Sequence, residues 1–115
     1  MKFMLLIHGD ETQSNAATPP DTKVMSAGYS AYTEALIKAG ALLEGSRLRP
    51  TTDAASVRIR NGKTEVLDGP YADTKEQFGG YYIIETADMD SALDWARRCP
   101  ASRLGTVEVR AVVQG

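Results

Sequence analysis

The hydrophobic residues of the chain fall into short runs separated by polar stretches, a pattern that predicts strands alternating with helices. Residues 3–7 are apolar without interruption, which is typical of a central strand that is covered on both faces. Residues 81–84 repeat this pattern within a strand that we expect over residues 81–85. Further strands are expected over residues 41–44 and 106–113. The runs therefore predict a sheet whose central strands need cover on both sides.

Two amphipathic helices are predicted between these strands. The first begins at residues 18–21, Thr-Pro-Pro-Asp, a typical helix start, and ends at Gly40. Its apolar stripe has three- and four-residue spacing and consists of Met25, Tyr29, Tyr32, Leu36 and Ala39. The second helix begins after the cap Asp88 and stops at Pro100. Its inner stripe consists of Met89, Ala92, Leu93, Ala96 and Cys99.

A β-hairpin is predicted over residues 55–67, because an Asn-Gly pair at residues 61–62 separates two strand-like segments. A two-residue turn there gives one opposite-charge pair and one apolar pair, Arg58 with Glu65 and Val57 with Val66. Side chains alternate across a strand, so Asp68 is expected on the same, apolar face as Val57. A carboxylate there needs donors or a cation, or its pKa rises.

Without the hairpin, the order of elements is βαββαβ, which predicts one α+β domain of ferredoxin-like type over residues 1–115. Two helices can cover only one face of such a sheet, whereas residues 3–7 and 81–84 are apolar on both faces. A second copy of the chain is the simplest cover for the other face. We therefore expect a homodimer through the sheet face, with a ligand cleft between the sheet and its partner.

Composition narrows the class of protein. A net charge of −2 gives no reason to expect nucleic acid or an anionic membrane as a partner. One cysteine excludes an intrachain disulfide and suits a reducing compartment, so we expect a cytoplasmic protein. The apolar run at residues 3–7 is too short for a signal sequence or a membrane span.

Residues 68–80, Asp-Gly-Pro-Tyr-Ala-Asp-Thr-Lys-Glu-Gln-Phe-Gly-Gly, are the densest cluster of turn-forming and charged residues. The spacing of Thr74 and Gln77 is that of a capping box and predicts one short helical turn, which Gly79 would end. Turn chemistry leaves four residues of the cluster unexplained: Asp68, Tyr71, Lys75 and Glu76.

These residues are the first candidates for a functional site. Asp68 is a candidate base, or alternatively it accepts backbone N–H groups of its own turn. Lys75 and Glu76 are candidate ligand-binding residues, or alternatively a solvated surface pair. Tyr71 is a loop aromatic that suits the wall of a pocket or a dimer contact.

His8 is the single histidine and follows the first strand on the face of Met4 and Leu6. It is a candidate acid–base residue, or alternatively a strand-end histidine with a solvent or backbone partner. Tyr32 could supply a hydroxyl, although its place on the apolar stripe also suits core packing. His8, Asp10 and Glu11 lack a second cluster of ligands, and no Gly-rich phosphate motif is present, so we expect no metal and no cofactor.

The segment from Asp68 to Tyr82 resembles the motif of the DGPF (DGPFAETKE-type) proteins of the YCII-related, YciI-like superfamily. The opening residues 1–7 and the closing residues 108–110 are similar to the same family. The resemblance implies a ferredoxin-like domain in a dimeric α+β barrel-type assembly. Some YciI-like proteins pair a His on the first helix with an Asp; the matching position falls near Gly28 and Tyr29, so only Asp68 of such a dyad is present.

The resemblance implies no single activity, because some relatives are linked to sigma factors and a few are degradative enzymes. Our leading hypothesis is a small homodimer that binds an unidentified small organic molecule near Asp68. If it is an enzyme, we expect lyase or isomerase chemistry with Asp68 as base and His8 or a tyrosine assisting. The alternative is a non-catalytic module that binds a ligand or a protein such as a transcription factor.

Overall fold

The computed structural model describes residues 1–11 and 19–114, with side chains described for residues 1–11 and 28–114. Eight regular elements and two short 3-10 helices follow one another along the described part of the chain. In order, they are β1 (Lys2–Gly9), α2 (Pro19–Lys38), β2 (Leu42–Arg47), η1 (Thr51–Asp53), β3 (Ala55–Arg60), β4 (Lys63–Asp68), β5 (Gln77–Glu85), α3 (Met89–Arg98), η2 (Pro100–Arg103) and β6 (Thr106–Ala111).

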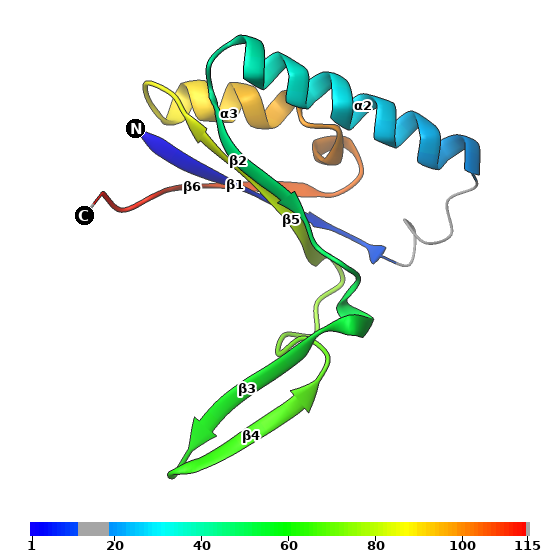
Figure 1. Ribbon diagram of the computed structural model, residues 1–115, viewed down its shortest axis with the longest axis vertical. Helices are drawn as coiled ribbons and strands as arrows, with labels where there is room; N and C mark the ends of the chain where they lie inside the picture. The colour runs from blue at the N-terminus through cyan, green and yellow to red at the C-terminus, as the bar shows by residue number, and fades with distance from the viewer. Residues whose placement is uncertain (12–18, 115) are drawn as a thin grey trace.

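The described strands form a four-stranded sheet of order β2-β5-β1-β6 and a separate two-stranded hairpin of β3 and β4. The paired strands of the larger sheet are antiparallel, and Leu5 of β1 lies between Tyr82 of β5 and Val109 of β6. Both described helices lie on one side of this sheet (Figure 1). The βαββαβ arrangement with an inserted hairpin confirms the predicted α+β fold.

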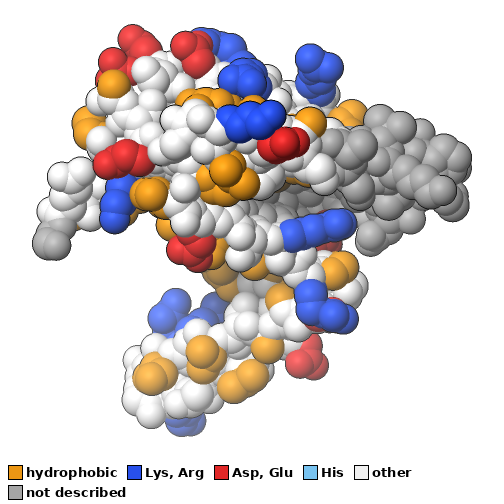
Figure 2. All heavy atoms as spheres, turned by 45° about the horizontal axis from the view of Figure 1, so that its top comes forward, with side chains coloured by type: hydrophobic (Ala, Val, Ile, Leu, Met, Phe, Trp, Pro, Cys, Tyr) orange, Lys and Arg blue, Asp and Glu red, His pale blue; other side chains and the backbone are white. Residues whose placement is uncertain are grey.

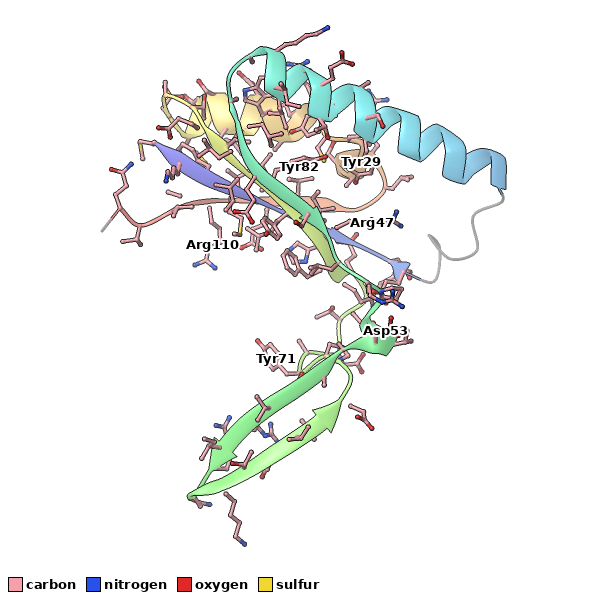
Figure 3. The ribbon with its side chains drawn as sticks, viewed as in Figure 1. Tyr29, Arg47, Asp53, Tyr71, Tyr82 and Arg110 are labelled. Carbon is pink, nitrogen blue, oxygen red and sulfur yellow. The ribbon has the colours of Figure 1, made fainter. Side chains whose placement is uncertain are left out.

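The core lies between the sheet and the two helices. Alternate residues of the central strands are fully buried there, with Phe3, Leu5 and Ile84 at most 1% exposed. From α2, Tyr32 and Leu36 pack against them, and small side chains of α3 close the layer. Tyr29 and Tyr82 lie in this layer between the helix and the sheet (Figure 3). Each predicted stripe therefore faces the core in part: Tyr29, Tyr32 and Leu36 of α2 and Ala92, Ala96 and Cys99 next to or on α3 pack there. Ala39, Met89 and Leu93 are exposed instead, and the side chain of Met25 lies outside the described residues.

The helix ends follow the predicted chemistry. Gly40 has a φ of 69°, a left-handed conformation that favours glycine, and its N–H donates to the carbonyl oxygen of Ile37. The Asp88 side chain accepts a hydrogen bond from the N–H of Ser91 at 2.8 Å, as expected of an N-cap. The cap predicted at Thr18 lies outside the described residues.

No described residue covers the sheet face that is turned away from the helices, and we call it the open face. It consists of the alternate residues of the central strands, half-buried and mostly apolar, with polar residues at its margins: Met4, Leu6, Tyr81, Ile83, Glu44 and Arg110. Tyr81 donates a hydrogen bond to the Glu44 carboxylate at 2.7 Å, and Arg110 lies on this side of the sheet (Figure 3). An apolar surface of this kind is typical of an interaction face.

The hairpin of β3 and β4, residues 55–68, extends away from the body, and we call it the arm. Its register is the predicted one, with Val57 opposite Val66 and Arg58 opposite Glu65. The arm lies on the helix-free side of the sheet (Figure 1). The radius of gyration is accordingly 16.0 Å, against about 13 Å for a compact domain of this length.

One local prediction was wrong. Residues 74–77 form no helical turn, because Gln77 already begins β5 and Gly79 lies within that strand. The Gln77 side chain still reaches back to Thr74, donating to its carbonyl oxygen at 2.6 Å. Strand β5 therefore starts earlier than the apolar run alone indicates, since Gly79 and Gly80 carry no hydrophobic signal.

Candidate functional site

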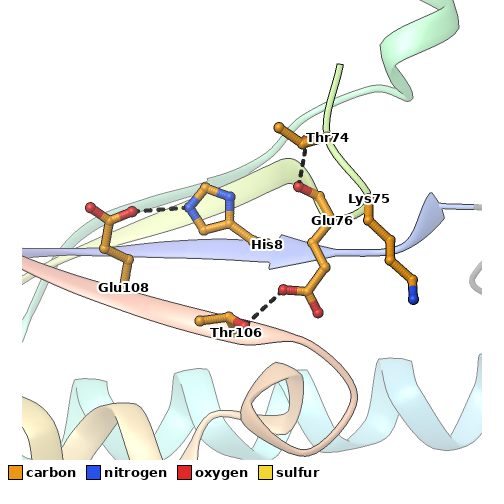
Figure 4. Close-up of a pocket in the computed structure, with 6 residues that line it drawn as sticks. All are labelled: His8, Thr74, Lys75, Glu76, Thr106 and Glu108. Atoms are coloured by element: carbon orange, nitrogen blue, oxygen red, sulfur yellow. Dashed lines mark hydrogen bonds and ion pairs between the residues drawn. The ribbon is translucent and has the colours of Figure 1, made fainter. Parts of the chain in front are cut away.

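A cleft of about 600 Å³ lies at one end of the open face, where β1, β6 and the loop before β5 meet. Alternation along β1 places His8 on the same face as Met4 and Leu6, and the paired strand β6 adds its own alternate residues. The cleft is lined by His8, Thr74, Lys75, Glu76, Thr106 and Glu108 (Figure 4). Residues from both halves of the chain therefore come together there through strand pairing.

His8 and Glu108 form the centre of the cleft. His8 Nε2 lies 3.3 Å from Glu108 Oε1 (Figure 4), and the two side chains are 26% and 49% exposed. The Nε2 atom itself is buried, and no described residue forms a well-aligned hydrogen bond with it. The ring of Phe78 packs against the imidazole with a centroid distance of 5.5 Å, which holds it from the β5 side. The imidazole is thus fixed beside a carboxylate that remains accessible to solvent.

The loop before β5 supplies the second carboxylate. Thr106 Oγ1 donates a hydrogen bond to Glu76 Oε1 at 2.8 Å, linking the loop to β6. Thr74 Oγ1 donates to the backbone oxygen of Glu76, also at 2.8 Å. Lys75 extends from the same loop and forms no ion pair or hydrogen bond with any described residue. The cleft therefore combines an imidazole, two carboxylates, two hydroxyls and an ammonium group.

Gly105 allows β6 to approach the end of β1. A Cβ atom at this position would collide with the carbonyl oxygen of His8, and it would lie 3.1 Å from the Cα atom of Gly9. Only glycine fits without moving one of the strands. The distance between His8 and the β6 side chains therefore depends on this residue.

The arrangement suits proton transfer and the binding of a polar small molecule. The volume of the cleft lies within the roughly 300–1,000 Å³ that is usual for such ligands, although in the single chain the cleft is wide open to solvent. A carboxylate beside one ring nitrogen of a histidine orients the ring and decides which nitrogen carries the proton. Within the described ranges, no group of three or more His, Cys, Asp or Glu side chains is placed to hold a metal ion.

The structure places the candidate residues from the sequence in three parts of the molecule: the cleft, the arm and the core. His8, Lys75 and Glu76 line the cleft. Asp68 ends β4 on the arm, exposed and outside the cleft lining, and its carboxylate has no hydrogen bond within the described part of the chain. Tyr71 is 87% exposed beside the arm and lines a second depression together with Leu67 and Arg58.

Tyr32 lies on the opposite side of the sheet from the cleft. It is 5% exposed, and its hydroxyl donates to the backbone oxygen of Trp95 at 2.7 Å. Burial raises its pKa well above the ordinary value of 10.0. Tyr32 therefore packs in the core and does not supply a hydroxyl to the cleft. Core packing was one of the two interpretations of Tyr32 from the sequence.

Thr106 and Glu108 were not among the sequence candidates. Both alternate with half-buried valines along β6, which places them on the face of His8 once the order of strands is known. This alternation was visible in the sequence, and the predicted ferredoxin-like fold places the last strand beside the first, but the register that sets Thr106 opposite His8 was not visible. Neither described helix is both long and apolar enough to span a membrane.

Comparison with known proteins agrees with this architecture. The chain is 38% identical to an uncharacterized protein of Rhizobium meliloti (strain 1021) over 112 residues, which cover 96% of this chain and 90% of that protein. Among solved structures, it resembles 5-chloro-2-hydroxyhydroquinone dehydrochlorinase from Burkholderia phenoliruptrix AC1100 in complex with 2,5-dihydroxybenzoquinone. That match has a TM-score of 0.54 and 15% identity, covering 100% of this chain and 96% of the other, and it shows the fold alone. The YCII-related domain matches residues 1–114, so the chain belongs to the YCII-related family.

Proposed function

We propose that the protein binds a small organic molecule in the cleft at the end of the open face and moves a proton on it. The observation that carries this proposal is the His8–Glu108 pair, at 3.3 Å, in a cleft of about 600 Å³. Glu108 favours the tautomer with the proton on Nε2, which leaves Nδ1 as the proton acceptor. When the ring takes up a proton, the Glu108 carboxylate stabilises its positive charge.

The expected reaction class is an elimination or isomerisation, in which a base removes a proton from the substrate. The dehydrochlorinase of similar fold is named for an elimination, and its complex holds a dihydroxybenzoquinone. Lys75 is suited to bind an oxygen atom of such a ring, because its ammonium group is a donor that lines the cleft. In this proposal His8 and Glu108 take the role of base that we expected of Asp68 from its motif.

Binding of 2,5-dihydroxybenzoquinone and related hydroxylated aromatic compounds, measured by isothermal titration calorimetry, tests this function. Replacing Glu108 by Gln removes a charged partner, and we expect Kd for a compound that binds wild type to rise about tenfold or more. His8→Gln should have a similar effect. Asp68→Asn is the matched control, because this carboxylate lies outside the cleft lining. Unchanged Kd values for both cleft variants would contradict the proposal.

We also propose that the protein is a homodimer in which the open faces of two copies pack together. The half-buried Met4, Leu6 and Ile83 support this, since the described helices cover only the other face.

Because of the motif at residues 68–80, we further propose that the chain is of the DGPF type within its family.

A further inference from the structure

The arm carries apolar side chains that nothing in the described chain covers. Val57, Ile59 and Val66 are 68%, 66% and 69% exposed, and the strand register places them on one face. Hydrophobic side chains are exposed over the arm in Figure 2. β-Branched residues of this kind are suited to packing on a pleated surface. A cluster of them on a protruding element indicates an interaction site.

The arm cannot derive much stability from its own contacts. A two-stranded hairpin that packs on nothing else is marginally stable in water. Two hydrogen bonds close the base of the arm: the Gly69 N–H donates to the Ala54 oxygen at 2.6 Å, and Ser56 Oγ donates to the Gly69 oxygen at 2.8 Å. The Glu11 carboxylate also accepts hydrogen bonds from Thr51 Oγ1 at 2.6 Å and from the Thr51 N–H at 2.8 Å. The base is therefore held in place, while the strands beyond it lack a packing surface.

The direction of the arm indicates what covers it. It projects on the helix-free side of the sheet, the side of the open face (Figure 1). Each of its strands has six residues and spans roughly 20 Å, whereas stacked sheets lie about 10 Å apart. Any molecule that packs on the open face as a second sheet therefore lies beside the arm.

The area of the exposed apolar surface shows whether the arm alone could form a stable interface. Three aliphatic side chains supply only a few hundred Å², whereas a stable interface buries about 800 Å² on each partner. The arm alone is too small, so the same partner must also cover the open face. A second copy satisfies both needs at once, because a two-fold arrangement gives each arm a body to pack on.

We propose that the arm embraces a second copy of this chain, packing its Val57, Ile59 and Val66 face against the body of that copy. This inference rests on the proposed homodimer and adds to it the element that holds the two copies together. Each copy then reaches past the open face of the other. The arm folds stably only in the assembled dimer.

Sedimentation velocity over a range of concentrations, from nanomolar to micromolar, tests the proposal with purified protein. Val57→Glu and Val66→Glu place a charge in the buried contact, and we expect each to weaken dimerisation roughly tenfold or more. Arg60→Glu is the matched control, because it introduces the same side chain on the opposite face of the arm. This control should dimerise as wild type does.

Amide hydrogen exchange in the same samples separates loss of the contact from loss of the fold. In the dimer we expect protected amides at residues 55–68, and on dilution or in Val57→Glu we expect these to exchange quickly while β1 and β5 stay protected. A monomeric wild type would overturn both the homodimer and the arm contact. A wild-type dimer that Val57→Glu and Val66→Glu leave unchanged, or whose arm amides exchange quickly, would overturn the arm contact alone.

Discussion

At the scale of single residues, neighbouring positions differ in what they contribute because the fold gives them different surroundings. Leu36 and Ile37 are adjacent on α2, but Leu36 is fully buried in the core and Ile37 is 59% exposed. His8 and Ile7 are adjacent on β1, yet Ile7 packs against the core and His8 lines the cleft. The core-facing side chains of α2 and β1 therefore stabilise the fold, whereas the opposite face of β1 carries His8 of the cleft.

Leu36→Ala should lower the free energy of unfolding by about 2–5 kcal/mol, since it leaves a cavity among well-packed side chains. Ile37→Ala, one residue along the same helix, should change it by less than about 0.5 kcal/mol. Chemical denaturation of both variants measures the two values. Equal losses would mean that α2 does not present its Leu36 face to the core.

The buried thiol and phenols near α2 make stability depend on alkaline pH. Burial raises the pKa of Cys99 above 9.0 and the pKa values of Tyr29 and Tyr32 above 10.0. Because the folded protein favours the neutral forms, their contribution is complete below these ordinary values and is lost as pH rises beyond them. We expect Tm to be insensitive to these groups near neutral pH and to fall above about pH 9.

A comparison of wild type with Cys99→Ala by thermal unfolding between neutral and alkaline pH checks this expectation. The variant should have the lower Tm at neutral pH, since it leaves a small cavity, and a later onset of the alkaline decline. If both proteins lose stability at the same pH and to the same extent, Cys99 is not the first of these groups to titrate.

At the scale of elements, residues at the ends of helices and strands determine where an element begins or ends and how strands pair. Asp88 fixes the start of α3, and Gly40 turns the chain from α2 into β2. The Asn-Gly turn fixes the register of the arm with Asn61 at a φ of 53° and Gly62 at 75°. These positions were predictable from sequence because turns and caps depend on local chemistry.

The Asp88 cap should make stability depend on acidic pH. The hydrogen bond from the Ser91 N–H lowers the pKa of the carboxyl below its ordinary value of 3.8. The ionised form is therefore favoured in the fold, and its contribution is present above that value and lost as pH falls through the lowered pKa. Asp88→Asn keeps an acceptor without a charge, so its Tm should decline less steeply with acid than that of wild type. If the Tm values of the two proteins fall in parallel with decreasing pH, the Asp88 cap does not contribute to the acid dependence of stability.

At the scale of the whole molecule, the fold could be predicted from sequence more completely than the cleft could. Periodicity, caps and one turn indicated each element and their order. The cleft depends on β6 lying beside β1, which brings Glu108 to His8 across most of the length of the chain. No local pattern indicates the register of this pairing. Asp68 attracted attention because its motif is conspicuous, whereas Thr106 and Glu108 lie in an ordinary alternating strand.

In the described part of the chain, the arm continues into the body through residues at the strand ends, near Ala54 and Gly69. Its length and side chains can therefore change while the core between sheet and helices stays as it is. In a cell that contains several related chains, such a segment would determine which copies pair with one another. Exchange of residues 55–68 between two relatives should therefore transfer pairing preference and leave the chemistry of each cleft unchanged.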